Sequence, residues 1–148
     1  MKNKNDFAIN LGEGFSPEHD ELVFEAEAYF KKNFKVNDVK YELPVEAKNK
    51  FIIGYIDLII IVEEEIKGID EFGKKVKWRK YKKYAIEVKP AINSFGALLR
   101  QLNTYKLQYA LRDYELCVYS NDKRYMVQLE SQGYKQFPTA LKTKAKKS

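Results

Sequence analysis

The fold of this chain is decided by the stretch Tyr84-Ala85-Ile86-Glu87-Val88-Lys89-Pro90. It has the pattern of a short buried strand in which one carboxylate and one ammonium group interrupt an apolar run. Because side chains alternate across a strand, we predict Glu87 and Lys89 on one face and Ile86 and Val88 on the other. Two charges on a buried strand face are costly unless they meet a metal ion, an anion or each other. The pattern therefore indicates a functional site.

A second isolated acid lies upstream, in the β-branched apolar stretch 51–62, whose one acidic residue is Asp57. Two strands that each carry one acid into an apolar sheet can place the two carboxylates side by side. Without a partner, such carboxylates repel each other and one of them keeps its proton. A hard divalent cation removes this conflict, because it prefers carboxylate oxygens as ligands. Asp57 and Glu87 are therefore candidate metal ligands.

Three short motifs follow one another along the chain: Gly54-x-x-Asp57, Glu87-x-Lys89 and Gln101-x-x-x-Tyr105. In this order they resemble the PD-(D/E)XK nuclease superfamily, which has the restriction-endonuclease-like fold. The third motif is similar to the branch that contains RecB-type and lambda-exonuclease-type domains. The resemblance covers residues 20–137 approximately. The chain departs from the family's motif at Ile56, which stands in place of a proline that is often missing in the family.

The resemblance implies an α/β fold and a hydrolytic activity. We expect a single domain over residues 16–138, with a central mixed sheet of about five strands flanked by helices. We expect a metal-dependent deoxyribonuclease that uses Mg²⁺, for which Mn²⁺ would substitute, to hydrolyse phosphodiester bonds in DNA, with RNA not excluded. Asp57, Glu87 and the backbone carbonyl of Val88 would hold the metal. Lys89 would position the attacking water or neutralise the transition state, and Gln101 would orient Lys89 or that water.

Two predicted helices carry further candidates. Ser16 caps the first, which runs to about residue 33. In the family a helix in this place often supplies an acid, and Glu25 is the candidate metal ligand; the alternative is a solvated helix carboxylate. The second helix is predicted over residues 95–111. The resemblance assigns Tyr105 to the substrate backbone, and the neighbouring Arg100 is a candidate phosphate contact.

A basic segment precedes the Glu87 strand. Residues 74–83 contain seven Lys or Arg, no acid, and interleaved aromatic residues. We expect a basic hairpin insertion at about residues 63–83, in which the basic side chains neutralise phosphates and the aromatic rings stack on bases. The candidate nucleic-acid contacts are Lys77, Trp78, Arg79 and Lys80. The alternative is a solvated hairpin edge that blunts aggregation.

The remaining elements are predicted from alternation and turn signals. Strands are expected at residues 39–45 and 114–119, and an edge strand at residues 134–137. Asp122 is expected to cap a short helix that ends near residue 133. The predicted packing face of the helix at residues 95–111 consists of Leu98, Leu99, Leu102 and Tyr109.

Composition supports a folded domain with a basic tail. The chain has 148 residues, 45% hydrophobic content and a net charge of +6, to which the C-terminal segment contributes four lysines and no acid. We expect residues 139–148 to be disordered and residues 1–15 to be loosely held. The single cysteine, Cys117, lies in an apolar run and is expected to be buried. No apolar stretch approaches ~18 residues, so we expect a cytoplasmic protein without a membrane contact.

His19 is the only histidine, and one histidine at a helix start does not predict a histidine-dependent nuclease or a zinc site. A glycine-rich phosphate loop is also missing from the sequence, so ATP-driven activity is not expected. Among nucleases, the pattern leaves open an exonuclease, a structure-specific endonuclease such as a junction resolvase, a restriction or homing enzyme, and a recombination-associated cutter, acting as a homodimer or with a partner subunit. The competing class is a catalytically silent nuclease-like module that binds nucleic acid or serves as a protein adaptor. A third is a subunit whose basic hairpin meets an acidic protein.

Overall fold

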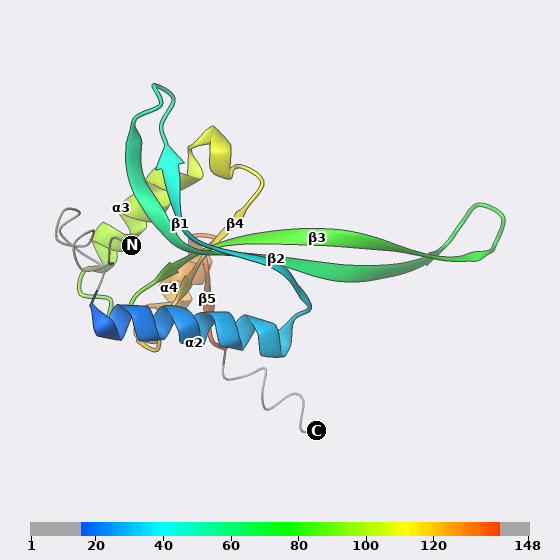
Figure 1. The fold of residues 1–148 in the computed structure, drawn as a ribbon, viewed down its shortest axis with the longest axis horizontal. Helices are drawn as coiled ribbons and strands as arrows, with labels where there is room; N and C mark the ends of the chain where they lie inside the picture. Colours follow the sequence, from blue (N-terminus) through cyan, green and yellow to red (C-terminus); the bar gives the residue numbers. More distant parts are fainter. Residues whose placement is uncertain (1–15, 140–148) are drawn as a thin grey trace, which may run out of the picture.

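The structure, a computed structural model, describes residues 16–139, which form one α/β domain. A five-stranded mixed sheet has the strand order β1-β2-β3-β4-β5, with helix α2 on one face and helices α3 and α4 on the other (Figure 1). The predicted α/β class with a five-stranded mixed sheet and flanking helices is therefore confirmed. The segment 1–15 and the tail from residue 140, which the sequence predicts to be flexible, lie outside the described residues.

Helix α2 spans Pro17–Asn33 and begins where the sequence predicts. The Ser16 side chain accepts a hydrogen bond from the backbone N–H of His19 at 3.0 Å, which satisfies one of the free donors of the first turn. The helix packs one apolar stripe on the sheet, and the buried residues of that stripe are Leu22, Val23, Ala26 and Phe30.

Three antiparallel strands follow: β1 (Val36–Glu46), β2 (Ile52–Ile69) and β3 (Lys75–Val88). Strands β2 and β3, with 18 and 14 residues, are far longer than β4 and β5, with 5 and 3 residues. Their outer parts leave the sheet as a two-stranded ribbon, residues 63–81, which we call the arm (Figure 1). The hairpin predicted as an insertion is thus a continuous extension of the strands that carry Asp57 and Glu87.

The arm ends in a tight turn at Asp70–Lys74. The Asp70 carboxylate accepts backbone N–H groups of Phe72 and Lys74, at 2.9 and 2.8 Å, and Gly73 takes the left-handed conformation with φ of 80°. Glu63, Glu64 and Glu65 pair across the ribbon with Tyr81, Lys80 and Arg79, so opposite charges extend the ladder.

The second half of the chain builds the other face of the sheet. It consists of α3 (Phe95–Lys106), a 3-10 turn (Tyr109–Leu111), β4 (Glu115–Tyr119), α4 (Met126–Ser131) and β5 (Lys135–Phe137). Strands β4 and β5 run parallel to β3. Of the described helices, not one is both long and apolar enough to cross a membrane.

Two predictions for this half are wrong. Helix α3 ends at Lys106, because the backbone turns extended at Gln108, so Tyr109 is 75% exposed and Leu111 enters the core in its place. Asp122 does not cap α4, which begins four residues later.

The Asp122 carboxylate joins two loops instead of capping a helix. It pairs with the Arg124 guanidinium at 2.7 Å and accepts the N–H of Ile92 at 2.9 Å. These bonds hold the pKa of Asp122 well below its usual range. They fix the loop that follows β3 against the loop that follows β4.

The core consists of one cluster on each face of the sheet. Ile86 and Val88 pack in the cluster beneath α2, together with Phe30, as the alternation predicts. Leu98 and Leu102 of α3 pack in the opposite cluster. The predicted burial of Cys117 is confirmed, and burial raises the pKa of its thiol.

Candidate active site

The site forms where β2 and β3 stop pairing. Their ladder ends at Leu58 opposite Ile86, and the next residues along the two strands are Asp57 and Glu87. Beyond this point β2 continues against β1, while β3 continues against β4. The two strands therefore part at the two acids. At this point a side-chain hydrogen bond replaces the backbone ladder: Asp57 Oδ2 accepts a hydrogen bond from the N–H of Val88 at 2.8 Å.

A cavity of about 890 Å³ opens at this point, walled by β2, the end of β3, α3 and the start of α2. It is lined by seven of the residues that the sequence singles out: Asp57, Glu87, Val88, Lys89, Arg100, Gln101 and Tyr105. These residues come from two strands and one helix. The fold thus brings together the three motifs on which the resemblance depends.

Glu87 and Lys89 share one face of β3, as predicted. Glu87 is 2% exposed, and Lys89 Nζ lies 3.9 Å from Glu87 Oε2. The side chain of Lys89 is 26% exposed and lines the cavity. The ammonium group offsets part of the cost of burying the Glu87 carboxylate.

Gln101 and Tyr105 lie one turn apart on α3, with Gln101 Nε2 3.4 Å from Tyr105 Oη. Tyr105 is 4% exposed, and its ring lies directly over Gly54 of β2. A Cβ atom at position 54 would be only 1.9 Å from Tyr105 Oη. The glycine of the first motif and the tyrosine of the third are therefore two halves of one packing arrangement.

His19 is the residue that the sequence reasoning missed. It is 5% exposed, and its Nε2 lies 3.3 Å from Asp57 Oδ1. Burial alone would lower the pKa of His19, but the hydrogen bond to Asp57 and the charges of Asp57 and Asp20 raise it. A signal was present in the sequence, because His19 precedes Leu22 by three residues and so begins the apolar stripe of α2.

Five candidates lie elsewhere. The structure does not bring Glu25 into the cavity: its Oε2 accepts hydrogen bonds from Tyr119 Oη at 3.0 Å and from Asn121 Nδ2 at 3.4 Å. Burial, followed by this hydrogen bond, raises the pKa of Tyr119. The other four lie on the arm, outside the cavity lining: Lys77, Trp78, Arg79 and Lys80.

The donor set of the cavity suits a divalent cation. Carboxylate and carbonyl oxygens are ligands of Mg²⁺ and Mn²⁺, and imidazole nitrogen favours transition metals. Asp57, Glu87, His19 and the carbonyl of Val88 supply these groups along one wall. Within residues 16–139, however, no three His, Cys, Asp or Glu side chains converge closely enough to enclose an ion.

Comparison of the chain with protein-family models, with curated proteins and with solved structures finds no match. The fold itself defines an α/β domain with a five-stranded mixed sheet. The case for a particular function therefore depends on the residues of the cavity and on the arm.

Proposed function

We propose that the chain is a metal-dependent nuclease of the restriction-endonuclease-like fold, which hydrolyses phosphodiester bonds in DNA. One observation carries this proposal. The acids Asp57 and Glu87 lie where two core strands part, and both line one cavity together with Lys89. Burying these charges in a sheet is unfavourable in free energy, and this supports a catalytic role.

Asp57, Glu87 and the Val88 carbonyl would hold the metal ion, and His19, whose Nε2 lies 3.3 Å from Asp57 Oδ1, would orient the Asp57 carboxylate. When bound there, a divalent cation lowers the pKa of water and stabilises charge on a phosphate group. Because carboxylate and carbonyl oxygens are ligands of both Mg²⁺ and Mn²⁺, either ion suits this set.

Lys89 is the group best placed to act on the substrate. Its ammonium nitrogen lies at the edge of the cavity, 3.9 Å from the buried Glu87 carboxylate. A cation held in this position stabilises negative charge that develops on the phosphate in the transition state. Gln101, bonded to Tyr105, would orient the lysine or the attacking water, and Arg100 would contact a neighbouring phosphate.

A second candidate is a nucleic-acid-binding or adaptor module without catalysis. The observation that favours it is the engagement of Asp57: one carboxylate oxygen accepts from Val88 and the other contacts His19. A carboxylate with two partners in the protein has less need of a metal ion. The two candidates differ in what they predict for metal-dependent cutting.

Cleavage assays separate the two candidates. Linear duplex, supercoiled plasmid, single strand and four-way junction would be incubated with Mg²⁺, Mn²⁺ or EDTA. We compare the wild type with Glu87→Gln and Lys89→Met, which keep side-chain size, and with Glu25→Gln as a matched carboxylate control outside the cavity. Calorimetry with Mn²⁺ alone gives a reading that does not depend on activity.

The nuclease proposal predicts metal-dependent cutting that Glu87→Gln abolishes, together with a loss of Mn²⁺ binding. Lys89→Met should lower the rate by about 10²–10³-fold while Mn²⁺ still binds. Glu25→Gln should cut like the wild type. A folded Glu87→Gln variant that cuts at the wild-type rate would refute the assignment. Nucleic-acid binding without cutting, on every substrate and with either metal, would favour the second candidate.

A further inference from the structure

The arm protrudes from the domain that residues 16–139 form, and its outer part does not pack against the rest of it. It is paired from Glu63 opposite Tyr81 to Ile69 opposite Lys75, and most of its side chains are exposed (Figure 1). Trp78 and Ile69 are 51% and 70% exposed. A two-stranded ribbon alone is marginally stable in water. Packing against the core therefore does not explain why the ribbon is this long.

The two faces of the arm differ in chemistry. Side chains alternate, so Ile66, Val76 and Trp78 share one face, where the Trp78 ring lies beside Gly68. Lys67, Lys75, Lys77 and Arg79 share the other face with Glu63, Glu65, Ile69 and Tyr81, and we call it the basic face. Alternation places Trp78 on the same face as Lys80 and on the opposite face from Lys77 and Arg79, so these four candidate contacts divide between the two faces of the arm.

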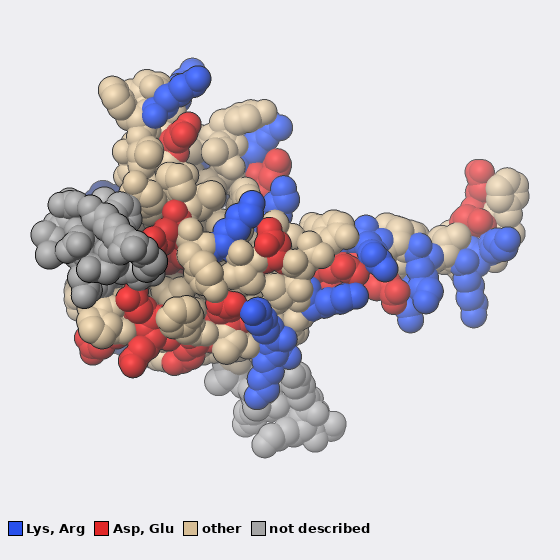
Figure 2. Space-filling view, viewed as in Figure 1, with Lys and Arg blue, Asp and Glu red and all other residues tan. Residues whose placement is uncertain are grey.

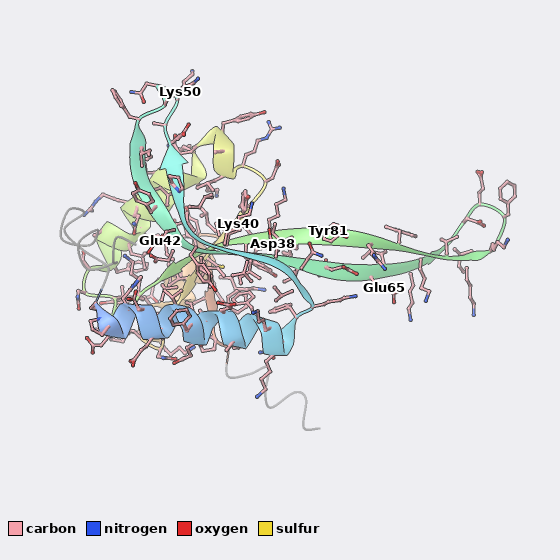
Figure 3. All side chains as sticks on the ribbon, in the orientation of Figure 1. Asp38, Lys40, Glu42, Lys50, Glu65 and Tyr81 are labelled. Atoms are coloured by element: carbon pink, nitrogen blue, oxygen red, sulfur yellow. The ribbon has the colours of Figure 1, made fainter. Side chains whose placement is uncertain are left out.

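The basic face carries an electrostatic conflict near its tip. Lys67 and Lys77 are directly opposite each other, and like charges in this position destabilise a strand pair. Near the base, acids relieve the repulsion: Glu65 lies 3.9 Å from Lys77, and Glu63 lies 3.2 Å from Arg79 (Glu65 is labelled in Figure 3). Over the part of the chain that the structure describes, neither Lys67 nor Lys75 forms an ion pair. The surplus positive charge fits a polyanionic partner.

Lys and Arg side chains follow the arm outward in the space-filling view, with acidic side chains between them and at the tip (Figure 2). The basic face also continues the face of the sheet that carries the site. Glu87 and Lys77 are ten positions apart on β3, where Ala85 and Ile86 pack in opposite core clusters, so alternation places Glu87 and Lys77 on one side. This side winds with the right-handed twist of the ribbon. A partner that follows it therefore passes from the cavity to the arm.

The dimensions fit a nucleic-acid duplex. Twelve residues separate Asp57 from Ile69 on the single strand β2, which at a rise of about 3.3 Å per residue gives a span of up to ~40 Å. This equals about 12 base pairs of B-form DNA. The major groove, about 12 Å wide, admits a two-stranded ribbon. A flexible single strand offers no groove and no fixed length.

We propose that the arm binds duplex DNA through its basic face and thereby makes the chain an enzyme for duplex substrates with about one helical turn beyond the cut. The part of this inference that concerns cleavage rests on the proposed function. The part that concerns DNA binding rests on the arm alone. The two parts are measured separately.

Binding is measured with the full chain carrying Glu87→Gln, in EDTA, by fluorescence anisotropy of labelled duplexes from 6 to 20 base pairs (assay lengths of roughly half to two helical turns) and of single strands. The test variant is Lys67→Ala/Lys75→Ala/Lys77→Ala. Its charge-matched control is Lys32→Ala/Lys40→Ala/Lys135→Ala, which removes three exposed lysines outside the arm and the cavity. A third variant replaces residues 67–77 by Asn-Gly, a two-residue turn that closes the ribbon at the Ile66–Trp78 pair.

We expect affinity to rise with duplex length up to about 12 base pairs and then to level off. The test variant should lower the slope of log K against log salt by about 3, whereas the control keeps the wild-type slope. The shortened arm should reach its plateau about 3 base pairs earlier, because it loses about 10 Å on each strand. Equal binding by the test and control variants, or equal affinity for single strands and duplexes, would overturn the proposal.

Failure of the arm and failure of the nuclease give different results. If wild-type protein cuts DNA but the arm variants change neither binding nor the shortest duplex that is cut, the nuclease stands and the arm proposal falls. If no metal supports cutting, but the test variant loses duplex binding as described, the arm proposal stands without the nuclease.

Discussion

Replacement of Gly54 by alanine tests the packing that joins the first and third motifs. The added Cβ would lie 1.9 Å from Tyr105 Oη, 2.9 Å from Cζ and 3.2 Å from Cε1. The ring must move by roughly 1.5 Å to restore an ordinary contact of ~3.5 Å. Tyr105 is 4% exposed, so it moves into packed neighbours. Overpacking of this kind costs about 1–3 kcal/mol of unfolding free energy.

Thermal unfolding measures this cost. For a domain of this size we expect Gly54→Ala to lower the Tm by about 3–10 °C. Gly96→Ala is the matched control: its Cβ would meet only the end of the Arg100 side chain, at 3.4 Å, and alanine favours the helix by about 0.5–1 kcal/mol. Adding Tyr105→Phe to Gly54→Ala removes the worst contact and should recover part of the loss. A Gly54→Ala protein as stable as the wild type would show that the close approach is not a constraint.

Two further predictions concern pH. The raised pKa of His19 means that its protonated form, paired with Asp57, stabilises the metal-free fold below about pH 6.5. The Tm should therefore fall as the pH rises through the folded-state pKa of His19. The affinity for Mn²⁺ should increase over the same pH range, because His19 must lose its proton. The His19→Gln substitution should abolish both trends. The lowered pKa of Asp122 stabilises the fold above about pH 4, and this contribution is lost as the pH falls towards the folded-state pKa. Asp122→Asn should flatten the acid limb of a plot of Tm against pH, and an unchanged acid limb would argue against the Asp122–Arg124 link.

Local patterns predict much of this fold. The serine cap and apolar stripe place α2, and β-branched alternation places the inner parts of β2 and β3. The alternation also predicts that Glu87 and Lys89 face away from Ile86 and Val88. These features depend on neighbours in sequence, which is why a single sequence reveals them.

The features that the sequence did not predict correctly depend on tertiary contacts. Asp122 has the composition of a helix cap, but a guanidinium two residues away and the N–H of Ile92 compete for its carboxylate. The 3-10 turn that removes Tyr109 from the core is set by the burial of Leu111. His19 reaches Asp57 only because the start of α2 lies at the edge where β2 and β3 part.

The shared strands of the arm and the site impose a rule on how the arm can vary in length. Since Asp57 and Lys67 lie on one β2 strand, insertion of two residues into each strand lengthens the arm and leaves the lysines facing the same way. Insertion of one residue into each strand would turn the outer lysines to the opposite face. The face that carries Trp78 would then point towards the DNA. Homologous or engineered arms that keep this function should therefore differ in steps of two residues per strand.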